Sequence, residues 1–453
     1  MGKRAIGWSV AECSDAEKAS RALERSLETT SAASAGPRVD AGFAPLRILF
    51  VAACPFPCTR GTPARVLSQV QTLKQFGVAV EVVAYSLRQG AAPPEIPVHR
   101  TPALPGYHRL EPGPTLQKLL FLDPLLLLKT LATARRRRAQ ILHGHHVEGG
   151  LVALAASRCL GLPVVFDAHT SLCAELQNYP LPLPASLARH AGSWLDAVLA
   201  RFSQHVITAS EHLRNELLAR CGPALSPAHI SWIPTALDPQ PACVAMCAVR
   251  KTGAESSSVV VYAGGLARFQ RIDLLREAFG EVWRALPETH LLIVSEDPAK
   301  ALETQWPGAT RHPRIRLVCP SDLAEMFALL READVAVSPR TATGGLPQKL
   351  LNYLRVGLPI VASQGSGEIL HNGETGLVVP NDDPRAFAQA LIHLLRDPKL
   401  RRQLASAGRS DVEQRFRWSN AAGQLLSVYT QVLRNRAAQS KRGETPSKVA
   451  QTA

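Results

Sequence analysis

The stretch that decides the fold is LRILFVAACPFPCTRGTPARVLSQVQTLKQFGVAVEVVAYS, residues 46–86. Its first eight residues (46–53) form a nearly continuous apolar run, which is typical of a parallel strand covered on both faces. A loop follows, then apolar residues at helical spacing over 65–76, and then a second apolar run over 78–86. This order of strand, loop, helix and strand predicts a β-α-β unit in a parallel sheet.

The same alternation recurs along the chain, and a chain of 453 residues is long enough for two domains. In the first half it predicts strands at 140–145, 163–169, 205–210 and 229–234, with helices at 151–161 and 212–222. The alternation stops and then restarts near Ser258. The expected organisation is a disordered tail (1–45), a first domain (46–236), a linker (237–257), a second domain (258–417), a helix packing back toward the first domain (418–436) and a disordered tail (437–453).

Composition limits the classes of protein further. The chain is 46% hydrophobic, so it is not disordered overall, and its net charge of +14 selects no partner by itself. The nine cysteines are scattered without zinc-site spacing, which favours reduced thiols. The first residues lack the apolar core of a signal peptide, and we find no run of 18 uncharged apolar residues. We therefore expect a cytoplasmic protein without a membrane span.

Several chemistries have no motif here. The first strand is not followed by G-x-G-x-x-G, and we find no P-loop, G-x-S-x-G or H-E-x-x-H motif. We therefore expect no nicotinamide, flavin or other cofactor. Asp382 and Asp383 precede Pro384 and are interpreted as a helix N-cap, and a metal-binding carboxylate pair is absent, so metal-independent chemistry is favoured. Aromatics make up only 5% and no basic patch is interleaved with them, which argues against nucleic acid as a partner.

The most informative motif is SPRTATGGLPQKLLNYLRVG, residues 338–357. A strand ends in a glycine-containing loop, and Pro347 is expected at the first helical position. The backbone amides of Gly345, Leu346 and Gln348 would then be free at a helix N-terminus, which is a site for anions.

Lys349 and Asn352 are three residues apart and share one face of this predicted helix. A cation and an amide at a helix N-terminus suit a diphosphate and a ribose. The alternative is a solvated lysine and an asparagine in a helix interior.

At these residues the chain resembles the retaining GT-B glycosyltransferases, the bacterial "glycosyl transferases group 1" of family 4. The resembling segments, in order over about 46–430, are HGHHVEGGLVALAASRCLGLPVVFDAHTSL (143–172), HVITASEHLRNEL (205–217), VVVYAGGLARFQRIDLLREAF (259–279), GLPQKLLNYLRVGLPIVAS (345–363) and GETGLVVP (373–380). The resemblance implies an α/β protein of the GT-B fold, with two Rossmann-like parallel-sheet domains facing a central cleft. It also implies transfer of a hexose from a nucleotide-sugar, the donor substrate, to a glycan or lipid-linked acceptor, as in cell-envelope polysaccharide synthesis.

The chain departs from the family at its donor motifs. Gly344 and Asn352 stand where many members have two glutamates, and Gly265 and Gln270 stand where many have arginine and lysine. A subset of the family similarly has K-L-L-N-Y. These departures leave open a catalytically impaired relative that binds a nucleotide-sugar or a partner, and an epimerase or phosphorylase of the same fold is a further alternative. With these departures, Arg268, Arg271, Arg340 and Lys349 are the cations left to hold a phosphate. The expected donor-binding residues are Arg268, Gln270, Arg271, Arg340, Gly344, Gly345, Leu346, Lys349 and Asn352, and the expected acceptor-side residues are Thr59, Arg60, Gly61 and Thr62.

His169 matches a family histidine that faces the donor sugar, and with Lys349 it is the expected catalytic residue; the alternative is a buried structural histidine. In HGHH, the alternating His143 and His145 with His146 would suit a metal, but we favour packing. Segment 116–138 is apolar and ends in four arginines. A core helix with a basic end is slightly favoured over an element on an anionic membrane surface.

Overall fold

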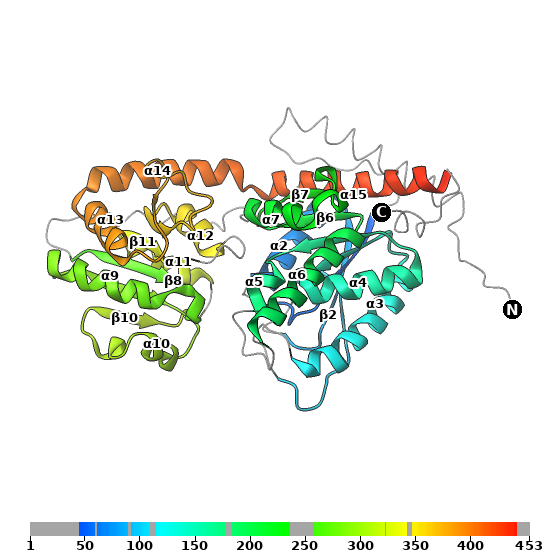
Figure 1. Cartoon of the computed structure of the whole chain (residues 1–453), viewed down its shortest axis with the longest axis horizontal. Helices are drawn as coiled ribbons and strands as arrows, with labels where there is room; N and C mark the ends of the chain where they lie inside the picture. Colours follow the sequence, from blue (N-terminus) through cyan, green and yellow to red (C-terminus); the bar gives the residue numbers. More distant parts are fainter. Residues whose placement is uncertain are drawn as a thin grey trace. The chain divides into compact units, whose positions relative to one another are not determined.

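Two parallel sheets organise the chain in this computed structural model (Figure 1). It describes residues 45–58, 61–88, 92–108, 115–176, 184–235, 257–321, 323–341 and 347–441. Apart from residues 45 and 257, the expected first tail and the linker lie outside these residues. The second expected tail is corrected in part, because residues 437–441 continue the helix that begins at Trp418. The chain divides into two compact units, residues 1–236 with 418–453, and residues 237–417.

The first unit is built on a seven-stranded sheet with the order β3-β2-β1-β4-β5-β6-β7. Its strands are β1 (Arg47–Ala52), β2 (Ala79–Ala84), β3 (Val98–Arg100), β4 (Ile141–His145), β5 (Val164–Ala168), β6 (His205–Thr208) and β7 (Ile230–Trp232). All neighbours pair in parallel. The strand order reverses between β1 and β4, and open α/β sheets bind ligands at the carboxyl ends of strands beside such a switch.

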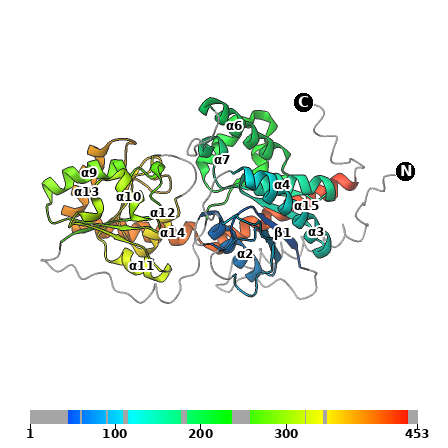
Figure 2. The ribbon, with the colours of Figure 1, turned by 90° about the horizontal axis from the view of Figure 1, so that it is seen from below.

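Helices cover both faces of this sheet. They are α2 (Gly61–Gln75), α3 (Asp123–Arg137), α4 (His146–Leu160), α5 (Leu172–Glu175), α6 (Ala185–Phe202), α7 (Glu211–Cys221) and α15 (Trp418–Lys441), with a π-helical turn η2 (Lys118–Leu122) and 3₁₀ turns η4 (Gly222–Ala224) and η5 (Pro227–His229). Helix α15 runs beside α2 (Figure 2). It buries Leu425, Tyr429 and Val432 in the same core as Phe50 and Val66.

The second unit has a six-stranded parallel sheet with the order β10-β9-β8-β11-β12-β13. Its strands are β8 (Val259–Ala263), β9 (His290–Val294), β10 (Ile315–Val318), β11 (Val335–Ser338), β12 (Ile360–Ser363) and β13 (Leu377–Val379). Its helices are η6 (Arg268–Gln270), α9 (Ile272–Ala285), α10 (Ala299–Gln305), η7 (Ala309–Arg311), α11 (Leu323–Arg331), α12 (Gln348–Val356), α13 (Pro384–Arg396) and α14 (Pro398–Arg415). The predicted fold class, two Rossmann-like parallel sheets, is confirmed.

Two predicted helix starts are corrected. The helix expected at 151–161 begins at His146, directly after β4, because Gly149 and Gly150 let α4 approach the sheet closely. A Cβ on Gly149 would lie 2.5 Å from the carbonyl oxygen of Val51. Pro347 is the N-cap of α12 and not its first helical residue, since its ψ of 110° is extended.

Other local expectations hold. Asp383 caps α13 by accepting a hydrogen bond from the Ala386 amide. The cysteines of the described ranges are free thiols. In the described part of the chain, no helix combines the length and the apolar content that a bilayer crossing requires.

Candidate active site

A buried ion pair lies at the carboxyl end of β5 in the first unit. Asp167 on β5 is fully buried, and Arg65 on α2 is 3% exposed. The guanidinium donates to both carboxylate oxygens, at 3.1 Å each, and also to the carbonyl oxygen of Ile233 at 2.7 Å. Gln69 donates a further bond to Asp167 at 2.9 Å. Burial alone would raise the pKa of the Asp167 carboxyl, but the charge of the Arg65 guanidinium holds it well below its usual range.

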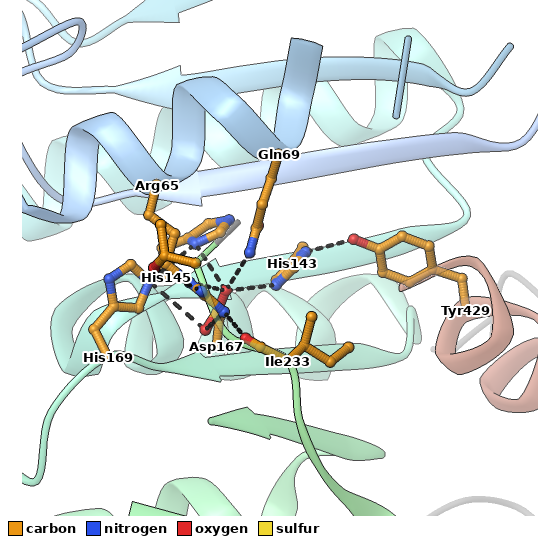
Figure 3. A network of polar contacts seen from close by, with 9 residues as sticks. Arg65, Gln69, His143, His145, Asp167, His169, Ile233 and Tyr429 are labelled. Carbon is orange, nitrogen blue, oxygen red and sulfur yellow. Dashed lines mark hydrogen bonds and ion pairs between the residues drawn. The ribbon is translucent and has the colours of Figure 1, made fainter. Parts of the chain in front are cut away.

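Three neutral histidines surround this carboxylate (Figure 3). His143 and His145 alternate on β4, so their rings lie on one face of the sheet and stack at a centroid distance of 4.3 Å. The Nδ1 atom of His143 lies 2.6 Å from the hydroxyl of Tyr429 on α15, and that of His145 lies 3.3 Å from His169 Nε2. Burial lowers the pKa of His143 to about 4 and of His169 to about 3, and that of His145 well below its usual value.

The spacing of these groups invites comparison with a metal site. Ligand atoms of His143, His145 and Asp167 lie within 4.8 Å of one another. Both oxygens of Asp167 already accept hydrogen bonds from Arg65, and the guanidinium supplies the positive charge that a metal would bring. His143 and His145 stack on each other and contact Tyr429 and His169, whereas His146 contacts two carboxylates.

His169 directly follows β5 and is 8% exposed. Its Nε2 atom faces His145 and lies 3.7 Å from an oxygen of Asp167. These contacts fix the Nε2 edge of the His169 ring. His169 thus places a neutral imidazole at the carboxyl end of a central strand, where open α/β sheets bind ligands.

The second unit carries a lysine placed for an anion. Lys349 on α12 is half-buried, and its ammonium donates to Gln270 Oε1 at 2.8 Å and to the Tyr262 hydroxyl at 3.1 Å. The same nitrogen lies 4.2 Å from the centre of the Tyr262 ring. Burial, together with the charge of Arg340, lowers the pKa of Lys349 well below its usual value. Both of its hydrogen bonds within the described residues are with neutral groups, so an anion there would restore the stability of the charged form.

The arginines near Lys349 differ in how far they are already neutralised. Arg340 lies over the Phe269 ring at 5.6 Å, and burial lowers its pKa. Within the described residues its Nε atom has no hydrogen-bond partner. Arg271 instead binds two carboxylates, those of Asp273 and Asp382. Arg268 is exposed on η6. Arg340 and Lys349 are therefore partly buried cations that have no carboxylate partner among the described residues.

The remaining expected residues are only partly described. Asn352 is half-buried on α12, one turn after Lys349. Gly61 and Thr62 form the start of α2. The other expected residues, Thr59, Arg60, Gly344, Gly345 and Leu346, lie outside the described residues.

Sequence reasoning missed Arg65, Asp167 and Tyr262. Asp167 had a usable signal, since a single carboxylate inside the apolar run VVFDA must find a buried cation or hydrogen-bond donors. Its partner is 102 positions away, and no local pattern indicates it.

Two glycosyltransferase family profiles match the chain in succession. The profile described as "Glycosyltransferase Family 4" matches residues 59–241, and that described as "Glycosyl transferases group 1" matches residues 257–397. The chain is a glycosyltransferase of the GT-B fold. Strands β2 to β7 of the first sheet lie within the first match, and all strands of the second sheet lie within the second.

Named relatives agree with this assignment. The phosphatidyl-myo-inositol mannosyltransferase of Mycobacterium leprae is 33% identical over 163 residues, which are 36% of this chain and 43% of that protein. The glycogen synthase of Mycobacterium tuberculosis is 28% identical over 312 residues, 67% of this chain and 72% of that protein. The chain thus spans less than half of the mannosyltransferase.

Solved structures show the same fold. Sucrose-phosphate synthase from Thermosynechococcus elongatus has a TM-score of 0.71 at 20% identity, covering 86% of this chain and all of that one. Anabaena HepE, solved in complex with UDP and glucose, has a TM-score of 0.65 at 16% identity, covering 85% of this chain and all of that one.

Proposed function

We propose that this glycosyltransferase is a retaining, metal-independent enzyme that moves a hexose from a nucleotide-sugar to a hydroxyl of a glycan or glycolipid, in cell-envelope polysaccharide synthesis. The observation that carries the proposal is the pair Lys349 and Arg340, two partly desolvated cations whose contacts in the described residues are with neutral groups. The complex of HepE with UDP and glucose supports a nucleotide-sugar donor.

The chemistry follows from where charge develops. The bond between the anomeric carbon and the diphosphate oxygen breaks, and the acceptor oxygen attacks from the same face, which retains the configuration. The acceptor's proton passes to the leaving phosphate oxygen. Lys349 and Arg340 stabilise the departing diphosphate as fixed charges in a partly dry site, and so take the part of a metal ion. Asn352 would hold the ribose, and neutral His169 would bind a hydroxyl of the hexose.

The donor assignment is tested first by a thermal-shift screen of the parent protein with nucleoside diphosphates and their sugars. A ligand at about 100 times its Kd stabilises the folded state by about 2.7 kcal/mol, so a hit identifies base and sugar together. If none of these compounds shifts the unfolding temperature, the nucleotide-sugar proposal is wrong.

Variants then separate the roles of the two α12 residues. Lys349→Ala should lower kcat by about 10²–10³, because phosphate charge grows in the transition state. Asn352→Ala should mainly raise the donor KM, since ribose contacts change little during transfer. Arg276→Ala is a matched control, because Arg276 on α9 forms only exposed contacts among the described residues, with Glu277 and with the carbonyl oxygen of Gln305. A near-parental kcat for Lys349→Ala would move the phosphate assignment to Arg340, Arg268 or Arg271.

A second candidate is a relative that binds donor without turning it over. The replacement of two family glutamates by Gly344 and Asn352 favours it. Donor binding with neither transfer nor donor hydrolysis would establish this reading, whereas turnover by the parent protein would dismiss it.

We also propose peripheral binding to the inner face of an anionic membrane through residues 116–138. The core-helix alternative explains only part of this segment, because Leu116, Leu119, Leu120 and Phe121 are 52–74% exposed. Arg135 to Arg138 are exposed at the other end of the helix. Such a helix places apolar side chains at one point of a lipid surface and positive charge at another.

Sedimentation with vesicles tests this membrane proposal. Changing the four arginines to glutamine should weaken binding to anionic vesicles and remove its salt dependence. Leu119→Gln with Leu120→Gln should weaken binding at every salt concentration. Equal sedimentation of all three proteins would restore the core-helix interpretation.

A further inference from the structure

The turn from β4 into α4 is made by a single residue, His146. Strand β4 ends at His145 and α4 begins at His146, which has a left-handed φ of 62°. This conformation is uncommon for residues other than glycine, although asparagine, aspartate and histidine adopt it more often than the rest. A glycine would satisfy the backbone here. The chain has a histidine, whose ring forms two side-chain contacts that a glycine could not form.

The ring of His146 bridges two carboxylates. Its Nδ1 atom lies 3.1 Å from an oxygen of Glu148, and its Nε2 atom lies 2.9 Å from an oxygen of Glu175. Both ring nitrogens must donate to satisfy these partners, so the ring is an imidazolium. Although burial opposes the charge, Glu175 and Glu148 raise the pKa of His146 well above its usual value. His146 is thus charged beside three neutral histidines.

The bridge ends on the segment that carries His169. Glu175 is the last residue of α5, and it also accepts a hydrogen bond from Thr170, the residue after His169, at 2.7 Å. The rings of His146 and His169 have centroids 6.3 Å apart. Glu148, on the other side, lies 3.5 Å from the ammonium of Lys118. The imidazolium therefore ties the end of β4 to the chain directly after β5.

We propose that His146 is a positioning residue for His169: by holding Glu175, it fixes residues 169–175 and so sets the direction of the His169 ring. The proposal rests on the proposed function in taking His169 to bind the donor hexose. His146 itself does not touch the substrate in this scheme. Its rigid, charged bridge keeps the neutral ring of His169 in the orientation that the reaction requires.

His146→Gly is the informative variant, because glycine adopts the left-handed turn without strain while both ion pairs are lost. Misplacing a reactive group by about 1 Å can cost about 10²-fold in rate, so kcat should fall by about 10- to 100-fold. The donor KM should stay within about twofold, since the nucleotide contacts lie on α12. Glu175→Gln breaks the same bridge from its other end and should give the same result if His146→Gly folds poorly.

His99→Asn is a matched control. His99 on β3 pairs with Glu81 on β2 at 2.5 Å, so it is another histidine–glutamate pair of the same unit. It should retain parental kcat.

A double variant separates positioning from an independent contribution. If His146 acts through His169, His146→Gly added to His169→Ala should reduce kcat no further than His169→Ala alone. If the reductions in kcat of the two single variants multiply in the double variant, the proposal is overturned. It is also overturned if both His146→Gly and Glu175→Gln keep kcat within twofold of the parent.

An NMR measurement decides the proposal without any turnover. The imidazole nitrogen signals of His169, assigned by their loss in His169→Ala, should shift in His146→Gly and in Glu175→Gln but not in His99→Asn. Unchanged His169 signals in both bridge variants would refute the positioning role. A parent protein that turns over no donor would refute the proposed function instead, and would leave this readout intact.

Discussion

Asp167→Asn is the substitution that tests the buried network most directly. It preserves the volume of the side chain and removes only its charge. Arg65 would then keep its positive charge at a site where it is 3% exposed, with two of its hydrogen bonds directed at an amide. The carbonyl oxygen of Ile233 and the hydroxyl of Thr235 would remain as its acceptors, at 2.7 and 3.0 Å.

The expected cost is large because it is a desolvation cost. Removing one partner of a buried ion pair typically destabilises a protein by about 3–5 kcal/mol. In a unit of this size each kcal/mol lowers Tm by about 2–4 °C, which gives a decrease of roughly 6–20 °C. Calorimetry and urea unfolding of parent and variant measure it.

A compensating variant separates the missing charge from lost packing. Arg65→Met with Asp167→Leu removes both charges and leaves apolar groups of similar size, so it should recover part of the loss. If Asp167→Asn lowers the free energy of unfolding by less than about 1 kcal/mol, the reasoning is refuted. Such a result would mean that water or another group accepts the hydrogen bonds of the guanidinium.

Three further predictions follow from other features. Acidification from pH 7 to pH 5 should lower the urea midpoint, because His143 and His169 have pKa values of about 4 and about 3 in the folded state but protonate near pH 6.5 in the unfolded state. The pKa of His146 is raised by folding, so its protonation adds stability as the pH falls, but this gain is complete at about pH 6.5. Transfer activity should survive EDTA, and loss restored by Mn²⁺ or Mg²⁺ would contradict metal independence. Gly149→Ala should cost about 1–3 kcal/mol because its Cβ would meet the backbone of Val51 at 2.5 Å, whereas Gly280→Ala on α9, with its nearest atom at 3.9 Å, should be neutral or stabilising in the same urea titration.

The periodicity of the sequence predicted most of the sheet strands, because buried parallel strands are recognisable as apolar runs. The runs at 46–53 and 78–86 contain β1 and β2, and the run at 163–169 contains β5. Strand β3 was missed, since it has three residues, all half-buried, at the edge of the sheet. Helix α6, with 18 residues, was also not predicted. Its Asp196 accepts hydrogen bonds from the Leu172 and Cys173 amides.

The site was harder to predict than the sheets. Lys349 was found because its helix and its glycine loop are adjacent in sequence, but its contacts with Tyr262 and Gln270 cross 87 and 79 positions. The role of His146 was also not predicted, since a left-handed residue that forms an ion pair with Glu175 has no sequence signature. Long-range pairing between side chains is set by the tertiary fold and produces no periodic pattern in the sequence.

The packing of α15 in the first unit has a consequence for protein synthesis. His143 and its partner Tyr429 are 286 positions apart, and the whole second unit is translated between them. At about 5–20 residues per second, a ribosome needs roughly 15–60 s to cover that interval. During this time the nascent first unit lacks the α15 side chains that complete the core formed with β1 and α2. The second unit is contiguous, so it can complete its own core before the unit that was begun first.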